Sequence, residues 1–187
     1  MFKEFELFEK LYFHELERKQ QLENNIALPT GTIVAAYGVL GYYFTHFHFA
    51  GKTYFLDSFV GTAFGVAAVS TFAMLALATF WCLRSALGSA YEYLPGAQTL
   101  RSYYVELKDW HLTQNPKLVA LKSENDFQDY LLEAMARCSQ RNWQTNLVRS
   151  EELHRTKRFA MFALTSLAVV AVAYYIDFWY NPSEIQP

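Results

Sequence analysis

Three long stretches of the chain carry no charged side chain, and the charged residues gather before, between and after them. Residues 24–51, 58–83 and 159–176 contain no Asp, Glu, Lys or Arg. About 20 apolar residues in a helix are enough to cross the roughly 30 Å hydrocarbon core of a bilayer. The pattern therefore predicts an all-α membrane protein with three transmembrane helices, at 25–50, 58–83 and 159–177.

The positions of Lys and Arg predict the orientation of these spans. Of the 16 basic residues, eleven lie between Arg84 and Arg158, and four precede the first stretch: Lys3, Lys10, Arg18 and Lys19. Loops rich in Lys and Arg stay on the cytoplasmic side. We expect a multi-pass inner (plasma) membrane protein with its N-terminus inside, a cytosolic helical domain at 84–158 between spans 2 and 3, and a short outer tail at 178–187.

The chain before the first span reads as an amphipathic cytosolic helix over residues 1–24. Its apolar residues recur at helical spacing between charges: Phe5, Phe8, Leu11, Tyr12, Leu16 and Leu22. This segment mixes acids and bases and lacks the apolar core and cleavage site of a signal peptide, so we expect span 1 to be an uncleaved anchor. Asn24, Asn25 and Pro29 predict a bend where the first span begins.

The segment between spans 2 and 3 should be helical, with breaks at Pro95-Gly96 and around Asn115-Pro116. Ser123 and Asp126 resemble a helix start. No Pro or Gly occurs from 117 to 177, so one helix can run from about 125 through the third span. Its apolar stripe needs a cover. Either the N-terminal helix and a helix at 97–112 supply it, or neighbouring subunits do.

Small residues recur at helical spacing in the first two spans: Gly31, Ala35, Gly38, Gly61, Gly65 and Ala68. Small side chains let two backbones approach closely in a membrane, where the hydrophobic effect does not separate protein from lipid. We predict that these residues pack helices together. Two arrangements remain open, a tight hairpin of spans 1 and 2 within one chain and an interface between subunits.

A basic cluster precedes the third span. We assign its members to the inner mouth of the membrane part or to partner binding: Arg149, His154, Arg155, Lys157 and Arg158. Each basic residue near an anionic leaflet contributes about 1 kcal/mol to membrane attraction. The simplest interpretation is an anchor that fixes topology, and specific lipid recognition is the alternative.

The sequence shows no pattern that predicts an enzyme. It has no phosphate-binding glycine loop, nucleophile elbow or zinc-ligand array, so we assign no catalytic residue, cofactor or metal. His46 and His48 diverge by about 200° on a helix and suit interfacial tips better than a metal pair. Cys82 and Cys138 are expected to be structural thiols in a reducing cytosol.

Two carboxylates lie at the predicted outer surface. Asp57 precedes Ser58 and Phe59 and is a candidate cap for the second helix. Asp177 follows the third uncharged stretch and is expected to be a solvated terminal residue, with an acidic ring in an oligomer as the alternative.

The pattern Arg149-x-x-x-x-His154 resembles the R-x4-6-H motif of the HEPN ribonucleases, with Ser150 as the polar residue after the arginine. In that family Arg and His meet across a dimer of helical bundles to cleave RNA. The resemblance covers six residues just before a membrane span. It implies a membrane-associated HEPN-like nuclease as a remote alternative, while a helix surface with no direct nucleic-acid contact is the favoured interpretation.

The layout of the chain resembles that of SLATT-type and related small bacterial membrane effectors, found beside nucleotide-signalling, retron and CRISPR systems. Two spans in a hairpin, a following helical segment and the sequence ELERKQQLENNIALPTG before the first span carry the likeness, over about residues 1–158. The third span departs from it. The resemblance implies pore formation or membrane disruption in antiviral defence against phage.

These observations favour a homo-oligomeric inner-membrane effector that forms or opens a pore on a cytosolic signal. Its expected partners are membrane lipid, other copies of itself, and a cytosolic protein or nucleotide. The alternative is a non-catalytic membrane anchor or assembly subunit that recruits a cytosolic partner. The spans lack the charges that mark transport paths, so a pore would be apolar at rest or lined by hydroxyls: Thr32, Thr45, Thr62, Ser70, Thr71, Thr79, Thr165 and Ser166.

Overall fold

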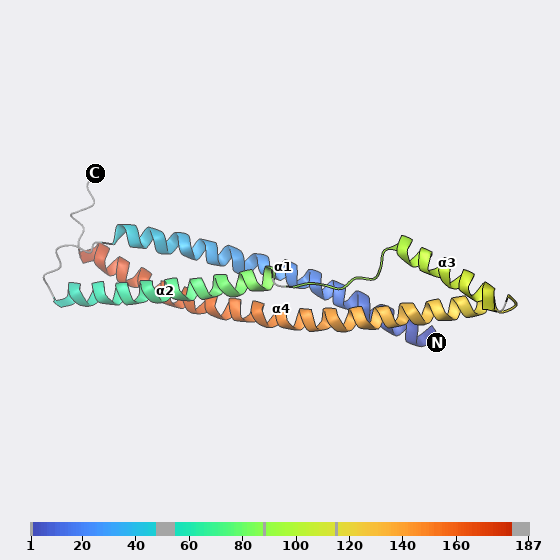
Figure 1. The fold of residues 1–187 in the computed structure, drawn as a ribbon. Helices are drawn as coiled ribbons and strands as arrows, with labels where there is room; N and C mark the ends of the chain where they lie inside the picture. Colours follow the sequence, from blue (N-terminus) through green and yellow to red (C-terminus); the bar gives the residue numbers. More distant parts are fainter. Residues whose placement is uncertain (1, 48–54, 88, 115, 181–187) are drawn as a thin grey trace. The chain divides into compact units, whose positions relative to one another are not determined.

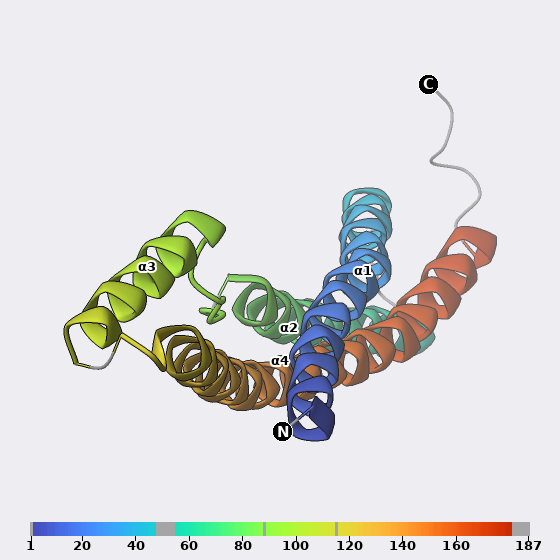
Figure 2. The ribbon, with the colours of Figure 1, turned by 90° about the vertical axis from the view of Figure 1, so that its right-hand side faces the viewer.

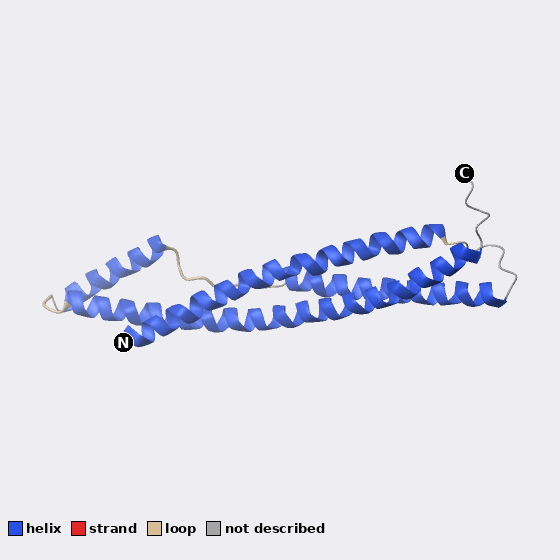
Figure 3. Cartoon of the chain, turned by 180° about the vertical axis from the view of Figure 1, so that it is seen from behind, coloured by secondary structure: helices blue, strands red, loops and turns tan. Residues whose placement is uncertain are grey.

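Four helices make up nearly all of the described chain. The computed structural model describes residues 2–47, 55–87, 89–114 and 116–180. The helices are α1 (Phe2–His46), α2 (Phe55–Leu87), α3 (Ala97–Gln114) and α4 (Val119–Tyr180) (Figure 1). Within these described ranges there is no strand (Figure 3), so the predicted all-helical class is confirmed.

Three of the four helices, α1, α2 and α4, are long and apolar enough to cross a membrane. As predicted, α2 and α4 contain the uncharged stretches 58–83 and 159–176, and α1 contains residues 24–46 of the first stretch; residues 48–51 lie outside the described ranges. The expected continuous helix is also present, because α4 runs unbroken for 62 residues. It begins at Val119, earlier than predicted. Ser123 is therefore not a cap but an interior residue, whose Oγ donates a hydrogen bond of 2.7 Å to the carbonyl of Val119.

The segments predicted as an N-terminal helix at 1–24 and a first span at 25–50 belong to one helix over the described residues. The structure has one helix of 45 residues, with Pro29 inside it. Proline removes one backbone hydrogen bond and crowds the preceding turn, but Pro29 is itself buried. Ile26 before it and Ile33 after it both pack on the same apolar cluster, and these contacts hold the helix on either side.

The chain divides into two compact units. Residues 1–22 with 89–148 form the first, which we call the hairpin unit, and residues 23–88 with 149–187 form the second, the span unit. We expected residues 1–24 and a domain at 84–158 to be separate. In the structure, the start of α1 belongs to the same unit as residues 89–148. The apolar stripe of α4 was expected to be covered either by helices of the same chain or by neighbouring subunits. The start of α1 lies in the same unit as the first half of α4 and covers part of this stripe.

The hairpin unit is built on α3 and the first half of α4, which a short turn connects (Figure 2). Tyr12 from α1 is buried with Met135 and Cys138 of α4, and partly buried apolar side chains surround them: Phe5, Phe8, Leu16, Leu94 and Leu131. The helix α3 is covered less well. His111 is its one buried residue within the described part, and the neighbouring Trp110 is exposed.

The span unit is a three-helix bundle in which α2 runs antiparallel to both α1 and α4. The Oγ1 of Thr30 lies 3.4 Å from the Sγ of Cys82, and the hydroxyl of Ser166 donates to the carbonyl of Ala67 at 3.0 Å. Side chains with almost no exposed surface fill the space between the helices: Phe64, Thr71, Leu75, Ala78, Ala163 and Val170. The centre of the bundle is therefore a packed core rather than a passage.

Candidate functional site

A polar cluster joins the three helices at one end of the span unit. We call it the polar tie; it consists of Glu23, Arg84, Ser85, Arg149 and Glu152. Arg149 is 3% exposed, and its Nε donates a hydrogen bond of 2.9 Å to the carbonyl of Ser85. The hydroxyl of Ser85 donates in return to the carbonyl of Arg149 at 3.2 Å. One terminal nitrogen of Arg149 lies 3.8 Å from the carboxylate of Glu23.

A second ion pair completes the polar tie. The Nε of Arg84 lies 2.6 Å from Oε1 of Glu152, whose side chain is 8% exposed, whereas that of Arg84 is 56% exposed. The cluster therefore contains two cations and two carboxylates. A buried charge is costly unless it is paired and hydrogen-bonded, so this arrangement fixes how α1, α2 and α4 pack at this end.

The five predicted inner-mouth residues do not form one site. Arg149 is buried in the polar tie, whereas His154, Lys157 and Arg158 are exposed on α4 and Arg155 is half-buried. Five residues turn a helix by about 500°, which leaves Arg149 and His154 about 140° apart. The two therefore do not meet within one chain, and their meeting across a dimer stays a prediction.

A groove lies beside the polar tie, between α2 and α4. We call it the basic groove; its volume is about 400 Å³, and its lining is Trp81, Arg155, Arg158, Phe159 and Phe162. The guanidinium of Arg155 lies 4.5 Å from the centre of the Trp81 ring, and that of Arg84 lies 5.6 Å from the same ring. Arginines within about 6 Å of an indole make attractive cation–π contacts.

The row of small residues in α1 lies outside the contact of this helix with the bundle core, although Gly38 borders a groove lined by Tyr174 and Tyr175 of α4. Gly31, Ala35 and Gly38 are exposed, and a Cβ atom added at Gly31 or Gly38 would meet nothing within 4 Å. The contact of α1 with the bundle core uses Ile33, Ala36 and Leu40 instead. Spans 1 and 2 do pack against each other within the span unit, but these three residues do not form the interface between them. Packing of the row against another copy stays a prediction.

The small residues of α2 are divided between two environments. Gly61 and Gly65 are half-buried and Ala68 is buried in the core. A Cβ atom at Gly65 would also meet nothing within 4 Å. Ala68 therefore packs helices as predicted, while Gly65 is not at a close helix contact within the chain.

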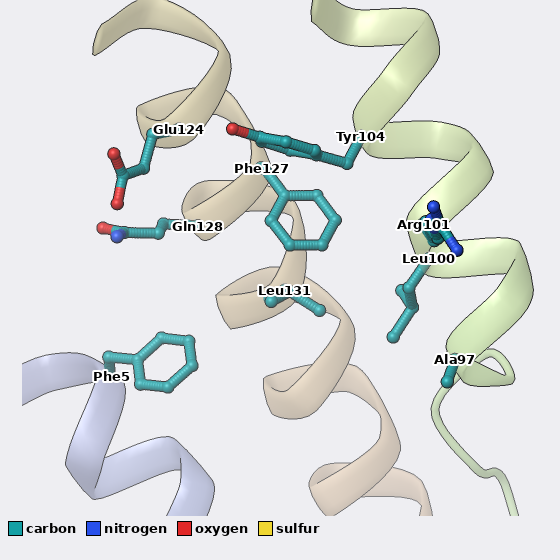
Figure 4. A pocket seen from close by; sticks show the side chains of 9 residues that line it. All are labelled: Phe5, Ala97, Leu100, Arg101, Tyr104, Glu124, Phe127, Gln128 and Leu131. Carbon is teal, nitrogen blue, oxygen red and sulfur yellow. The ribbon is translucent and has the colours of Figure 1, made fainter. Parts of the chain in front are cut away.

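The hairpin unit contains a groove of about 720 Å³ between α3, α4 and the start of α1 (Figure 4). We call it the aromatic groove; its lining is Phe5, Ala97, Leu100, Arg101, Tyr104, Glu124, Phe127, Gln128 and Leu131. In Figure 4, Tyr104 of α3 extends over Phe127 of α4 and Leu100 points into the space beside Leu131; the rings of Tyr104 and Phe127 have centroids 5.2 Å apart. Small-molecule sites commonly have volumes of about 300–1,000 Å³ and mainly apolar walls with a few polar groups.

The segment that enters α3 is held by asparagines of α4. We call residues 89–96 the strap. The side-chain amide of Asn142 accepts from the backbone N–H of Glu92 and donates to its carbonyl, each at 2.9 Å. Asn146 accepts from the hydroxyl of Tyr91 at 2.6 Å and donates to the carboxylate of Glu15 at 2.9 Å. Both asparagines have no exposed surface, so the strap is tied to α4 and α1 by satisfied polar contacts.

Sequence reasoning missed the polar tie and the strap. The signal for the strap is the spacing of Asn142 and Asn146, which places two short amides on one face of a helix. The signal for the polar tie is Glu152, an acidic residue one helical turn after Arg149 in a segment that was otherwise interpreted through its basic residues.

The remaining polar candidates differ in their surroundings. The ring of His46 stacks on Tyr42 with centroids 4.4 Å apart; His48 lies outside the described residues, as does the side chain of Asp57. Asp177 is 3% exposed within α4, so the expectation of a solvated terminal residue is wrong, because the helix continues to Tyr180. Among the residues that the structure describes, no three His, Cys, Asp or Glu gather into a group that could hold a metal ion.

Both cysteines are buried free thiols. Burial raises the pKa of the Cys138 thiol, and the nearby carboxylate of Glu92 raises it further. A thiol with a raised pKa is a poor nucleophile at neutral pH because little thiolate is present. This agrees with a structural role for Cys138.

Comparison with protein-family models, with curated proteins and with solved structures found no match to the chain.

Proposed function

We propose that the chain is a homo-oligomeric inner-membrane effector, in which several copies of the span unit form or open a permeation path. In this proposal the polar tie lies at the cytoplasmic face and the hairpin unit is cytosolic, because eleven of 16 basic residues lie between Arg84 and Arg158. No catalytic step is assigned to the chain.

The packed core of the span unit supports a path between copies. Phe64, Leu75 and Val170 have at most 1% of their surface exposed, and interiors packed in this way leave no continuous space for ions. A single bundle is therefore not a pore. If the protein is permeable to ions, the path has to be lined by the outward faces of several bundles.

The exposed small-residue row on α1 is the observation that carries the proposal. Gly31, Ala35 and Gly38 are exposed, and a Cβ atom added at Gly31 or Gly38 would meet nothing within 4 Å; Gly38 also borders a groove lined by Tyr174 and Tyr175 of α4. Such rows are a common contact surface between membrane helices because they allow the backbones to approach closely. A helix of a second copy is the partner we assign to this face.

The aromatic groove is the place where we propose that a cytosolic signal binds. Tyr104 and Phe127 offer two ring faces, and Arg101 lines the same groove. A nucleotide could stack its base on a ring and place a phosphate on the guanidinium. An apolar side chain of a partner protein would use the same rings, so both kinds of signal fit the chemistry of the groove.

A role in antiviral defence is the part of the proposal that follows from the layout shared with SLATT-type effectors. The proposed membrane activity does not depend on this role. The third span, which that layout lacks, supplies one of the three helices of the packed bundle.

Membrane-potential measurements on cells that express the full chain test the proposal. The wild-type chain should depolarise the membrane when its concentration is raised, because assembly follows mass action. The double variant Gly31→Ile with Gly38→Ile should lose most of this depolarisation, although its own bundle has open space at both sites. The matched control is Ala73→Ile with Ala76→Ile on the exposed face of α2, which should depolarise like the wild type.

A non-catalytic anchor or assembly subunit is the second candidate. The observation in its favour is the packed, charge-balanced bundle, which needs no further copy to be complete. The same experiment separates the two functions. Absence of depolarisation in the wild-type chain at every expression level, with normal protein in the membrane, contradicts the effector and supports the anchor.

A further inference from the structure

The basic groove lies where the charged part of the chain gives way to its apolar part on two helices at once. Arg158 is the last charged residue before the uncharged stretch 159–176 of α4, and Trp81 lies three residues before Arg84, the first charge after the stretch 58–83 of α2. These two boundaries meet in one groove. Tryptophan favours the headgroup level of a bilayer, and arginine near the end of a membrane helix extends its charge to the same level, so we place the groove at this depth.

The groove has an excess of positive charge. Arg155 bonds Glu151 at 2.5 Å, but the carboxylate is 64% exposed, and exposed ion pairs of this kind are weak. Arg84 is neutralised by Glu152. Arg158 has no ion-pair partner within the described ranges. Three arginines therefore face two carboxylates around the groove, and the free cation is one that lines it.

The other side of the groove is apolar. Phe159 and the exposed Phe162 follow Arg158 along α4, and Trp81 faces them from α2. Arg155, Arg158 and Phe162 are spaced by three and four residues, so they lie on one face of the helix. A cationic end beside an apolar wall fits a ligand that is itself anionic at one end and apolar at the other.

We propose that the basic groove binds an anionic phospholipid. The phosphate lies between the guanidinium groups of Arg155 and Arg158, and the first carbons of the acyl chains lie against Phe159 and Phe162. A free phosphate ion offers the same charge but leaves the apolar wall without a partner. The site adds a specific lipid to the chain and does not depend on whether the span unit forms a pore.

Thermal unfolding of the full chain in detergent tests the proposal. The protein is titrated in parallel with dioleoyl phosphatidylglycerol, with dioleoyl phosphatidylcholine and with inorganic phosphate. Phosphatidylglycerol should raise the unfolding temperature of the wild-type protein at lower concentration than the other two. The variant Arg158→Gln should need about five times more phosphatidylglycerol for the same shift, because one basic residue contributes about a factor of five at an anionic surface.

Lys157→Gln is the matched control, since Lys157 is exposed, adjacent in sequence and absent from the lining of the groove. It should retain the wild-type response. Equal weakening by Lys157→Gln would overturn the proposal in favour of general surface charge, and equal shifts with phosphatidylglycerol and phosphatidylcholine would overturn it as well. A shift with inorganic phosphate as large as that with phosphatidylglycerol would replace the lipid with a free anion. Because Arg158 is exposed and Gln keeps its stem, the variant is expected to fold; a lowered unfolding temperature without lipid would identify Arg158 as structural and refute the proposed role.

Discussion

The ion pair of Arg84 and Glu152 should behave differently according to which partner is removed. In Arg84→Met, a carboxylate that is 8% exposed loses its cation, whereas in Glu152→Met the arginine left behind is 56% exposed and stays in contact with water. Leaving a buried charge unpaired is costly, and leaving an exposed one unpaired is not.

The expected sizes follow from this asymmetry. Removing one partner of a fully buried pair costs about 3–5 kcal/mol. Because Arg84 is more than half exposed, water already reaches one side of the pair, and we expect Arg84→Met to cost about 2 kcal/mol. Glu152→Met should cost less than about 1 kcal/mol. The double variant should be closer to the wild type than Arg84→Met is, because it leaves no unpaired buried charge.

Unfolding of the full chain in mixed micelles, with increasing sodium dodecyl sulfate and helix content measured by circular dichroism, gives these free energies. Lys157→Met is the control, because Lys157 is exposed on the same helix and has no ion pair within the described residues; it should change the free energy of unfolding by less than about 0.5 kcal/mol. Equal costs for Arg84→Met and Glu152→Met, or an additive double variant, would refute the argument that the buried carboxylate dominates the pair.

Three further predictions concern other parts of the chain. Asn142→Ala should cost about 2–3 kcal/mol and speed amide exchange in the strap, because two backbone groups lose their partner; the exposed Gln144→Ala should do neither. Gly65→Ala should be neutral and Ala68→Leu should cost about 1–3 kcal/mol in thermal unfolding, since a Cβ has space at the first site and Ala68 is buried. Maleimide labelling of Cys138, followed by mass spectrometry, should be slow at pH 7.5 and should keep increasing to higher pH than the labelling of a free cysteine does, because the pKa of Cys138 is raised. Equal effects of Asn142→Ala and Gln144→Ala would contradict the first prediction, and equal effects of Gly65→Ala and Ala68→Leu would contradict the second. Labelling of Cys138 as fast as that of a free thiol at pH 7.5 would contradict the third.

The raised pKa of Cys138 also has a consequence for stability. The folded protein binds this proton more tightly than the unfolded chain does. This difference in proton binding contributes to the free energy of unfolding. The contribution is fully present below the pKa of Cys138 in the unfolded chain, and it is lost as pH rises through the pKa of Cys138 in the folded protein.

The features of the fold that could be predicted are those that depend on the composition of one continuous stretch of the chain. Absence of charge over 58–83 predicts a span by length alone, and absence of Pro and Gly after 117 predicts a long α4. Pro29 did not mark a boundary between two helices, because tertiary packing on both sides of it keeps α1 continuous.

Which face of a span turns inward could not be predicted from residue type. In α1, Ile33 belongs to the inward row and Gly31 to the outward row. Both rows are apolar, and lipid is as apolar as a protein core, so hydrophobicity does not distinguish them. In soluble helices the exposed face is polar and this ambiguity does not arise.

The polar contacts of the candidate sites were hidden for a different reason. Asn142 binds a peptide group of the strap, and Arg149 binds the carbonyl of Ser85. Every residue carries these backbone groups, so the sequence cannot say which of them an asparagine or arginine will contact. The positive charge of the cluster before span 3 was evident from the sequence. Which of its arginines is buried and which line a surface groove depends on how α4 packs against the other helices.

Cross-linking in native membranes tests the central claim, that copies of the chain meet through the exposed small-residue row of α1. Both native cysteines are replaced by alanine, and Gly38→Cys is compared with Ala76→Cys, an exposed position on α2. Because a disulfide requires Cα atoms within about 7 Å, mild oxidation should give dimers with Gly38→Cys and only monomers with Ala76→Cys. Monomers alone at Gly38→Cys, with the protein present in the membrane, would contradict the claim.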